Sequence, residues 1–456
     1  MSITEAVPGP KTRIRNKLVP GTIEHARAIP YYRELWADRP GATAVGTVAD
    51  LTALPVVGKY EPAGGMAVVG HPDRTPSVLM HSSGTTGHPF TRYRSAEEVQ
   101  ELSALLSSLN ARARERMDEA RPIVHLSTIS KRHHGNSIGA LAVERSVTLG
   151  LLSERDLVKA LGLLRRPQLF PDLTDPLIQL SGTPDDLVVL AHAVQEAGLL
   201  DQLRPRTVTA LADYLTDGHR DFLAACFPDA RIVHRYSLSE VVGGATRCER
   251  CGLFHFDVHV VPQVLSLDGE QSLTSGVGRL VLTELFPFSQ YQPFIRYDTG
   301  DLVEVFESPC EPGEVSVALV GRRAHIPLVE HAGRQVPVFR PIALRGALES
   351  LPELQRGPMH ATIAPYDVLP GSAPRAKAEF HPATPGAPAR LELTAVTAFA
   401  PHLFPRQAEE LRARVREVVL GSSPELRELA AAGVCELDVR LTGDRRAADP
   451  FTVRGA

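Results

Sequence analysis

The sequence predicts an α/β protein with a large N-terminal domain, a β-rich part appended to that domain, and a small C-terminal α+β domain. Strand-like runs alternate with amphipathic helices between residues 122 and 235, which is typical of a parallel sheet with crossover helices. Residues 254–306 then contain three β-rich runs in succession, which favour antiparallel strands. The 456 residues also exceed what one compact core usually holds, so more than one domain is expected.

The alternating region begins with a long amphipathic helix at residues 96–121. Its apolar side chains recur at helical spacing, at Val99, Leu102, Leu105, Leu106 and Leu109. The apolar run PIVHLS that follows at 122–127 predicts a buried strand. Further helices are expected at 153–165 and 185–199, and further strands at 177–181, 206–211 and 231–235.

The boundary of the small domain is expected close to residue 322, giving domains of residues 1–322 and 323–456. A stretch rich in glycine, proline and charged residues, at 311–335, separates the two patterns there. Beyond it, the sequence predicts helices at 340–350 and 405–419 and strands near 376–381 and 391–396.

Composition excludes several classes of protein. The formal net charge of −4 gives no electrostatic case for a nucleic-acid partner, which usually needs a basic face, and leaves a local basic patch as the alternative. The N-terminal segment has no apolar core of a signal peptide, and no run approaches the ~18 apolar residues of a membrane span. Five cysteines in so long a chain do not suit a disulfide framework. We therefore expect a cytoplasmic protein with no nucleic-acid or membrane partner.

The octet SSGTTGHP at 82–89 is the sharpest local signal. Glycines allow a backbone to approach an anion closely, and hydroxyl groups add hydrogen-bond donors for phosphate oxygens. The candidate phosphate-binding residues are Ser82, Ser83, Gly84, Thr85, Thr86 and Gly87. No Lys-Ser or Lys-Thr pair follows, so the loop is not a Walker motif. The alternative is a plain polar turn after a strand.

A second signal is the segment CERCGLFH at 248–255. The spacing of Cys248 and Cys251 suits a tetrahedral zinc ion, and His255 and Cys310 can complete the set if two β-turns converge. His259 is the rival fourth ligand. We expect a structural zinc site with no open coordination position, and the alternative is a group of unliganded thiols.

Several ordered segments together resemble the phenylacetate–CoA ligase family of the acyl-adenylate-forming superfamily. The resemblance covers about residues 28–325 and is weak beyond them. The matching segments are IPYY at 29–32, LPVVGK at 54–59, SSGTTGHP at 82–89, LSGTP at 180–184, YSLSE at 236–240, RYDTGD at 296–301 and VGR at 320–322. It implies a large adenylate-forming domain with a β-rich subdomain and a small, mobile C-terminal domain.

The resemblance also implies roles for single residues in binding ATP and Mg²⁺. Tyr236 would lie against the adenine ring, Glu240 would ligate Mg²⁺, and Asp301 would accept hydrogen bonds from the ribose hydroxyls. Arg322 would touch the ribose or a phosphate, and Glu240 and Thr86 would serve catalysis. The alternatives are a core tyrosine, a helix-start glutamate, a turn-capping aspartate and a surface arginine.

The acid substrate is expected near His133 and His134, where family members place an aromatic residue or a histidine. Either histidine would gate the pocket or orient the carboxylate, and a solvated basic turn is the alternative. Positive charge from His234 and Arg235 would suit an anionic substrate. Asp213 lies where the family has a turn beside the nucleotide, although the local sequence departs from the family pattern.

Two departures bear on the mechanism. The hinge aspartates that usually follow the Gly-Arg pair are absent, and Arg322 is followed by Arg-Ala-His. The family also carries a lysine near the C-terminus that contacts the carboxylate and the α-phosphate. The last lysine of this chain is Lys377, in a context that does not match, and Arg445 and Arg446 offer a different donor geometry.

The resemblance implies ATP-dependent activation of a small carboxylic acid as an acyl-adenylate, with pyrophosphate release and transfer to the thiol of CoA. The alternatives are a ligase that passes the acid to an amine or nitrogen nucleophile, and a degraded homologue that only binds nucleotide. The expected cofactors are ATP, Mg²⁺ and structural Zn²⁺, with CoA as one candidate acceptor. Whether the chain forms a homodimer stays open.

Overall fold

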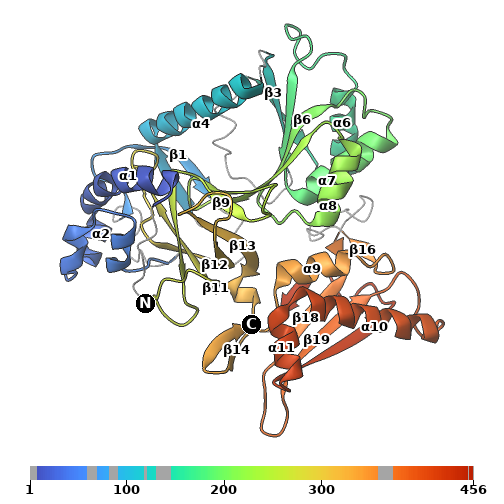
Figure 1. Cartoon of the computed structure of the whole chain (residues 1–456). Helices are drawn as coiled ribbons and strands as arrows, with labels where there is room; N and C mark the ends of the chain where they lie inside the picture. The colour runs from blue at the N-terminus through green and yellow to red at the C-terminus, as the bar shows by residue number, and fades with distance from the viewer. Residues whose placement is uncertain are drawn as a thin grey trace.

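The computed structural model describes residues 8–58, 69–81, 91–117, 121–129, 145–151, 153–357, 373–449 and 451–454. It confirms the predicted fold class: a large α/β unit carries the β-rich part, and a small α+β unit follows it. In Figure 1 the small unit, orange to red, lies beside the β-rich part and below helices α7 and α8. Eleven of the described strands form one continuous sheet in the large unit.

One half of this sheet is parallel, with the strand order β4–β3–β5–β6–β7. The crossover helices each begin after a hydroxyl side chain, Ser153, Thr183 or Thr216, that accepts a hydrogen bond from a backbone N–H of the first turn. The elements are β3 (Ile123–Ile129), β4 (Arg145–Gly150), α6 (Glu154–Leu164), β5 (Leu177–Gly182), α7 (Pro184–Glu196), β6 (Pro205–Ala210), α8 (Asp217–Cys226) and β7 (Arg231–Ser237).

The other half is antiparallel and continues from β7 in the order β8–β9–β13–β12–β11–β10. Strand β13 (Val315–Arg322) is inserted between β9 and β12, although the sequence predicted no strand in that stretch. The last strand of the large unit therefore lies inside the sheet and not at its edge. The remaining strands are β8 (Gly244–Arg247), β9 (Phe254–Phe256), β10 (Val260–Leu265), β11 (Gly276–Glu284) and β12 (Tyr297–Glu307).

N-terminal helices cover the antiparallel half. Val19 and Ile23 of α1 share one buried core with Val264 and Leu282 of the sheet. A hairpin of β1 and β2 leads into the long helix α4, which lies at the upper left of Figure 1. The elements are α1 (Pro10–Arg27), α2 (Pro30–Leu35), η1 (Pro40–Ala44), η2 (Ala49–Ala53), β1 (Pro76–His81), β2 (Thr91–Ser95) and α4 (Ala96–Met117).

The small unit has its own core, in which Leu391 and Leu437 of the sheet pack against Leu411 and Val415 of α10. Four of the described strands form its sheet in the order β20–β19–β18–β21. Its elements are η3 (Arg323–His325), β14 (Leu328–His331), β15 (Arg334–Pro337), α9 (Pro341–Glu349), β16 (Arg356–Gly357), β17 (Ala373–Pro374), β18 (Ala376–His381), β19 (Ala389–Val396), α10 (Pro405–Ser422), α11 (Pro424–Ala431), β20 (Cys435–Thr442) and β21 (Thr452–Arg454).

The two units meet where α9 contacts α8 and β13. This contact matters for function because it closes one side of the cavity described below. Within the described ranges, none of the helices combines the length and hydrophobicity needed to cross a bilayer.

Candidate active site

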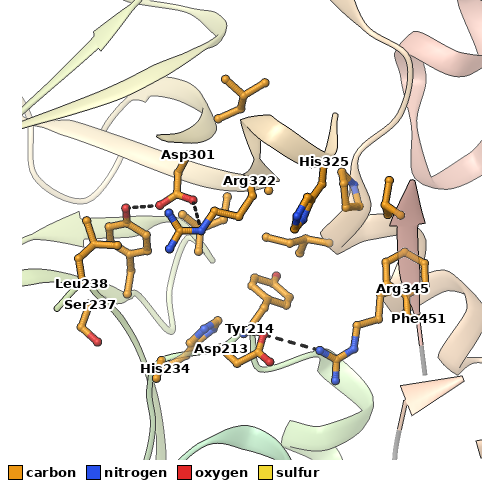
Figure 2. Close-up of a pocket in the computed structure, with 18 of the residues that line it drawn as sticks. Asp213, Tyr214, His234, Ser237, Leu238, Asp301, Arg322, His325, Arg345 and Phe451 are labelled. Carbon is orange, nitrogen blue, oxygen red and sulfur yellow. Dashed lines mark hydrogen bonds and ion pairs between the residues drawn. The ribbon is translucent and has the colours of Figure 1, made fainter. Parts of the chain in front are cut away.

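A cavity of about 510 Å³ lies between the large and the small unit (Figure 2). Its walls come from the carboxyl ends of β6 and β7, from β12 and β13, and from the small unit. The lining residues are Ala212, Asp213, Tyr214, His234, Arg235, Tyr236, Ser237, Leu238, Asp301, Leu302, Leu319, Gly321, Arg322, His325, Pro341, Ile342, Arg345, Phe451, Thr452 and Val453. Ligands of open parallel sheets commonly bind at this carboxyl edge.

Tyr236, Asp301 and Arg322 form one connected group in this cavity. The hydroxyl of Tyr236 donates a hydrogen bond to Oδ2 of Asp301 at 2.7 Å, and Nε of Arg322 lies 3.2 Å from Oδ1 of the same carboxylate. The register of β12 and β13 places Asp301 directly opposite Arg322. Arg322 remains half exposed, with 53% of its side chain accessible, so its guanidinium is available to a ligand.

Burial sets the protonation behaviour of this group. It raises the pKa of Asp301 above its ordinary value, although the positive charge of Arg322 and the hydrogen bond from Tyr236 oppose that rise. Burial also raises the pKa of the Tyr236 hydroxyl well above 10, and the neighbouring charge of Asp301 acts in the same direction. Tyr236 is therefore a neutral donor, and Asp301 is the acceptor.

Glu240 follows β7 and is buried, with 7% of its surface exposed. Its negative charge raises the pKa of both Asp301 and Arg322, which places a third charged group beside the pair. Glu284 holds the backbone just after Glu240, because its Oε1 accepts a hydrogen bond from the backbone N–H of Val242 at 2.6 Å. Glu240 thus sits on an ordered turn close to the cavity.

The turn after β6 forms a second wall of the cavity. Ala212 adopts a φ of 68°, a left-handed conformation that costs free energy for a residue with a Cβ atom. Asp213 and Tyr214 follow, and the backbone N–H of Tyr214 donates to Oδ1 of Asp213 at 2.7 Å. Backbone strain of this kind is common at functional sites, and here it lies in the wall of the cavity.

The positive charge expected from His234 is absent near pH 7, and the charge of Arg235 is offset by an ion pair. Arg235 is paired with Asp257, with Nη2 and Oδ2 2.6 Å apart. Burial lowers the pKa of His234 to about 4, and its Nε2 accepts a hydrogen bond from the backbone N–H of Leu215 at 3.3 Å. His234 is therefore neutral near pH 7.

Several predicted site residues lie outside the described residues: Ser82, Ser83, Gly84, Thr85, Thr86, Gly87, His133 and His134. The hairpin strands that flank 82–90 are described, and β2 and the start of α4 are held by buried contacts. Arg92 of β2 lies 2.7 Å from the Glu284 carboxylate, and both side chains are buried. Oε2 of Glu98 accepts hydrogen bonds from the backbone N–H groups of Gln290 and Tyr291.

The C-terminal basic residues lie elsewhere. Lys377 on β18 pairs with Glu379 at 2.6 Å, and Arg446 is 96% exposed beside Asp444. Neither these two nor Arg445 lines the cavity. Among the described residues that do line it, the arginines are Arg235, Arg322 and Arg345.

Cys248, Cys251, His255 and Cys310 come together at the far end of β8, β9 and β13. Their ligand atoms all lie within 4.8 Å of one another. Sγ of Cys251 is 3.2 Å from Nε2 of His255, and Sγ of Cys248 is 3.8 Å from Sγ of Cys310. His259, the rival ligand, is outside this group, and its ring lies against Phe288.

The surroundings of the cluster fit a metal ion. Glu311 lies 3.2 Å from Nδ1 of His255, an arrangement that fixes the ring and leaves Nε2 facing the thiols. Lys11 of α1 pairs with the same glutamate at 2.7 Å. Burial raises the pKa of the Cys248 thiol, but hydrogen bonds from the backbone of Cys251 and Arg250 outweigh it and lower the pKa to about 7.

Sequence reasoning missed Arg345, His325 and the C-terminal segment that includes Thr452. These residues belong to the small unit, and no local pattern marks them as cavity residues. They enter the site only because α9, η3 and β21 face the large unit.

Comparison with solved structures identifies the fold. The 2-hydroxyisobutyryl-CoA ligase in the postadenylation state with 2-HIB-AMP gives a TM-score of 0.65 at 16% identity, covering 99% of this chain and 90% of that chain. An open conformation of that ligase with 2-HIB-AMP and CoA gives 0.62 at 16% identity, covering 99% and 91%. The GH3.15 acyl acid amido synthetase gives 0.51 at 14% identity, covering 95% and 86%.

No protein-family model and no curated protein matches the sequence. The structural matches nevertheless extend over both units of the chain. At such low sequence identity the likeness establishes the fold alone, and the chain therefore shares the fold of the 2-hydroxyisobutyryl-CoA ligase and of the acyl acid amido synthetase.

Proposed function

We propose that the protein is an adenylate-forming ligase that activates a small carboxylic acid with ATP. The observation that carries the proposal is the grouping of Asp213, Tyr236, Asp301 and Arg322, from separate strands and turns, around one cavity. An aromatic ring, acceptors for hydroxyl and amino groups and a half-exposed cation are what a purine nucleotide requires. The fold is that of enzymes solved with acyl-adenylates, which supports this reading.

In the proposed reaction, an oxygen of the substrate carboxylate attacks the α-phosphorus of ATP. A bond forms between that oxygen and phosphorus, the bond to the bridging oxygen of the β-phosphate breaks, and pyrophosphate leaves. The product is a mixed anhydride of the acid and AMP. Such chemistry depends mainly on positioning and on neutralising charge at the phosphate oxygens.

The nucleotide residues have separate roles in this proposal. Tyr236 packs against the base, and Asp301 accepts hydrogen bonds from the ribose hydroxyls. Glu240 would hold Mg²⁺, which supplies positive charge to the phosphates when bound. The hydroxyls and backbone of the loop Ser82–Gly87, with Thr86 among them, would bind the phosphates, and His133 and His134 would face the acid.

Arg322 is the cation that we propose to neutralise charge at the phosphates. Arg235 is neutralised by Asp257, and Arg345 is buried among three carboxylates. Arg322 is more exposed and has Asp301 as its carboxylate partner. Its guanidinium can turn toward a phosphate when the ribose hydroxyls occupy Asp301.

The second half-reaction is proposed to transfer the acyl group to the thiol of CoA, with release of AMP. The sulfur attacks the acyl carbon, a thioester bond forms, and the bond from that carbon to the phosphate oxygen breaks. An amine acceptor is the alternative, since an acyl acid amido synthetase shares the fold. The cluster of Cys248, Cys251, His255 and Cys310 is proposed to bind a structural zinc ion that takes no part in either step.

The test is release of pyrophosphate from Mg·ATP with a panel of aryl, fatty and amino acids, each with and without CoA or free amino acids as acceptors. Release that depends on one acid supports adenylation, and consumption of CoA or of an amine names the acceptor. Binding of ATP without release, for every acid in the panel, would favour a degraded homologue. Absence of ATP binding would overturn the proposal.

A further inference from the structure

The two units are joined at the cavity by one buried guanidinium. Arg345 of α9 has only 5% of its side chain exposed and faces three carboxylates. Nη1 lies 3.8 Å from Oδ1 of Asp213, Nη2 lies 3.5 Å from Oδ1 of Asp185, and Nε lies 3.0 Å from Oε1 of Glu349. Asp213 and Asp185 belong to the large unit, so Arg345 of the small unit pairs across the interface.

Helix α9 makes a second contact across the same interface. Oε2 of Glu349 accepts a hydrogen bond at 2.5 Å from Oγ1 of Thr216, the residue that caps α8. Asp185 lies in the first turn of α7. The positive ends of two helices therefore help to stabilise the carboxylates around Arg345. Without its guanidinium, the three carboxylates would repel one another.

Asp213 is the member of this group that faces the cavity. A quarter of its side chain is exposed, compared with 12% for Asp185 and 7% for Glu349. Oδ1 is occupied by the backbone N–H of Tyr214 and faces Arg345. Within the described part of the chain, Oδ2 accepts no hydrogen bond, so it can receive a donor from a ligand. Figure 2 shows the pair spanning the lower part of the cavity.

We propose that Arg345 is a positioning residue that holds the carboxylate of Asp213 toward a bound purine, whose exocyclic amino group donates a hydrogen bond to Oδ2. The aromatic rings of Tyr214 and Tyr236 line the same cavity and offer surfaces on which a purine packs. The inference rests on the proposed nucleotide site. It adds that recognition of the base depends on docking of the small unit.

This arrangement couples two equilibria. If Arg345 orders Asp213 only when the units are docked, a nucleotide with an amino group favours docking, and docking tightens that nucleotide by the same factor. A nucleotide whose base has a carbonyl oxygen at that position gains nothing from Asp213, because a carboxylate oxygen cannot donate to it. Preference for adenine over hypoxanthine is therefore the direct readout.

The experiment measures binding of ATP and of inosine triphosphate, without acid substrate, by calorimetry. The wild-type protein is expected to bind ATP at least about tenfold more tightly, since one hydrogen bond to a charged group is worth about that factor. Arg345→Met is expected to remove most of this preference. Arg345→Lys keeps the charge but loses the forked geometry, and is expected to recover part of it.

A matched control is Arg340→Met. Arg340 also links the two units, with contacts of 2.5 Å to Glu304 of β12 and to Glu425 of α11, but it does not line the cavity. This variant is expected to weaken both nucleotides equally and to keep their ratio. If Arg345 served only to dock the units, Arg345→Met would change the ratio of ATP to inosine triphosphate affinity no more than Arg340→Met does. That result would overturn the inference.

Asp213→Asn tests the pair from the other side and keeps the proposal falsifiable if Arg345→Met does not fold. The preference of this variant for ATP over inosine triphosphate is expected to fall to the level of Arg345→Met. The double variant, which carries both changes, is expected to show no further fall. A wild-type protein that binds neither nucleotide would overturn the proposed function together with this inference. Binding of ATP with a preference that survives Asp213→Asn would overturn the inference alone.

Discussion

The hydroxyl of Tyr236 and the carboxylate of Asp301 are joined by a buried hydrogen bond of 2.7 Å between β7 and β12. The bond connects the last parallel strand of the large sheet with a strand of its antiparallel half. The other oxygen of this carboxylate, Oδ1, faces Arg322. The residue proposed to receive the ribose is therefore oriented by the residue proposed to receive the base.

Removing this hydrogen bond should shift the pH dependence of ATP binding. The Tyr236 hydroxyl favours the charged form of Asp301, so Tyr236→Phe should raise the pKa of Asp301 further above its ordinary value. Because the ribose needs the carboxylate, binding should be lost on the acid side at a higher pH than in the wild type. The measurement is ATP affinity as a function of pH.

Tyr214→Phe is the control for that series. Its ring lines the same cavity, and its hydroxyl interacts with Arg247 and not with Asp301. The acid limb should stay where it is in the wild type. If Tyr236→Phe lost ATP affinity at the same pH as the wild type, the hydrogen bond would not set the pKa of Asp301.

Loss of the Asp301 charge should weaken nucleotide binding directly. Asp301→Asn keeps the size of the side chain but replaces one acceptor with a donor, and ATP affinity should fall at least about tenfold. Asp298→Asn serves as the comparison, because Asp298 is on the same strand, pairs with Arg279 at 2.8 Å and does not line the cavity. Equal affinities of the two variants would remove Asp301 from the nucleotide site.

The cysteine cluster predicts about one zinc ion per chain, as expected for a closed site of four ligands. Cys310→Ser should lose the metal and lower the melting temperature, since a structural metal contributes to folding. Cys226→Ser is the control, because Cys226 is a buried free cysteine outside the cluster. Metal analysis and thermal denaturation check both variants. A wild-type protein that contains no metal, and a Cys310→Ser variant with the wild-type melting temperature, would contradict the site.

The buried pair of Arg92 and Glu284 predicts a stability effect that reaches the phosphate loop. Glu284→Gln leaves Arg92 without its charge partner, which should cost about 3–5 kcal/mol. Since β2 follows residues 82–90 directly, affinity for ATP should fall more than affinity for adenosine. Glu307→Gln, at an exposed position of β12, should change neither melting temperature nor affinity. Loss of adenosine and ATP binding to the same degree would argue against the link.

Much of the fold could be predicted from local patterns. The helices at 153–165, 185–199 and 340–350 and the strands at 177–181 and 376–381 were found within a few residues of their observed positions. Amphipathic spacing and hydroxyl caps act within one or two turns, so the sequence shows them directly. Strand β13 was missed because its charged and glycine-rich flanks hide a run that is buried only against β9 and β12.

The properties of the candidate site also divide into those that the sequence shows and those that only the folded structure shows. Tyr236, Glu240, Asp301 and Arg322 could be named because they lie in short segments that resemble a known family. The neutral state of His234 and the pairing of Arg235 could not, since both depend on side chains from other elements. The contact of Glu311 with His255 could not be predicted either, because it depends on the pairing of β13 with β9.

The sequence by itself predicted most of the order of elements, the residues proposed to bind phosphate, ribose and metal, and a small unit after the large one. Tertiary structure alone decided which of those residues share a cavity, which charges are cancelled, and that Arg345 of the small unit faces Asp213 of the large one. The physical reason is that capping and amphipathic spacing depend on neighbours along the chain. Burial and ion pairing depend on neighbours in space, which the packing of the sheet and of α9 selects.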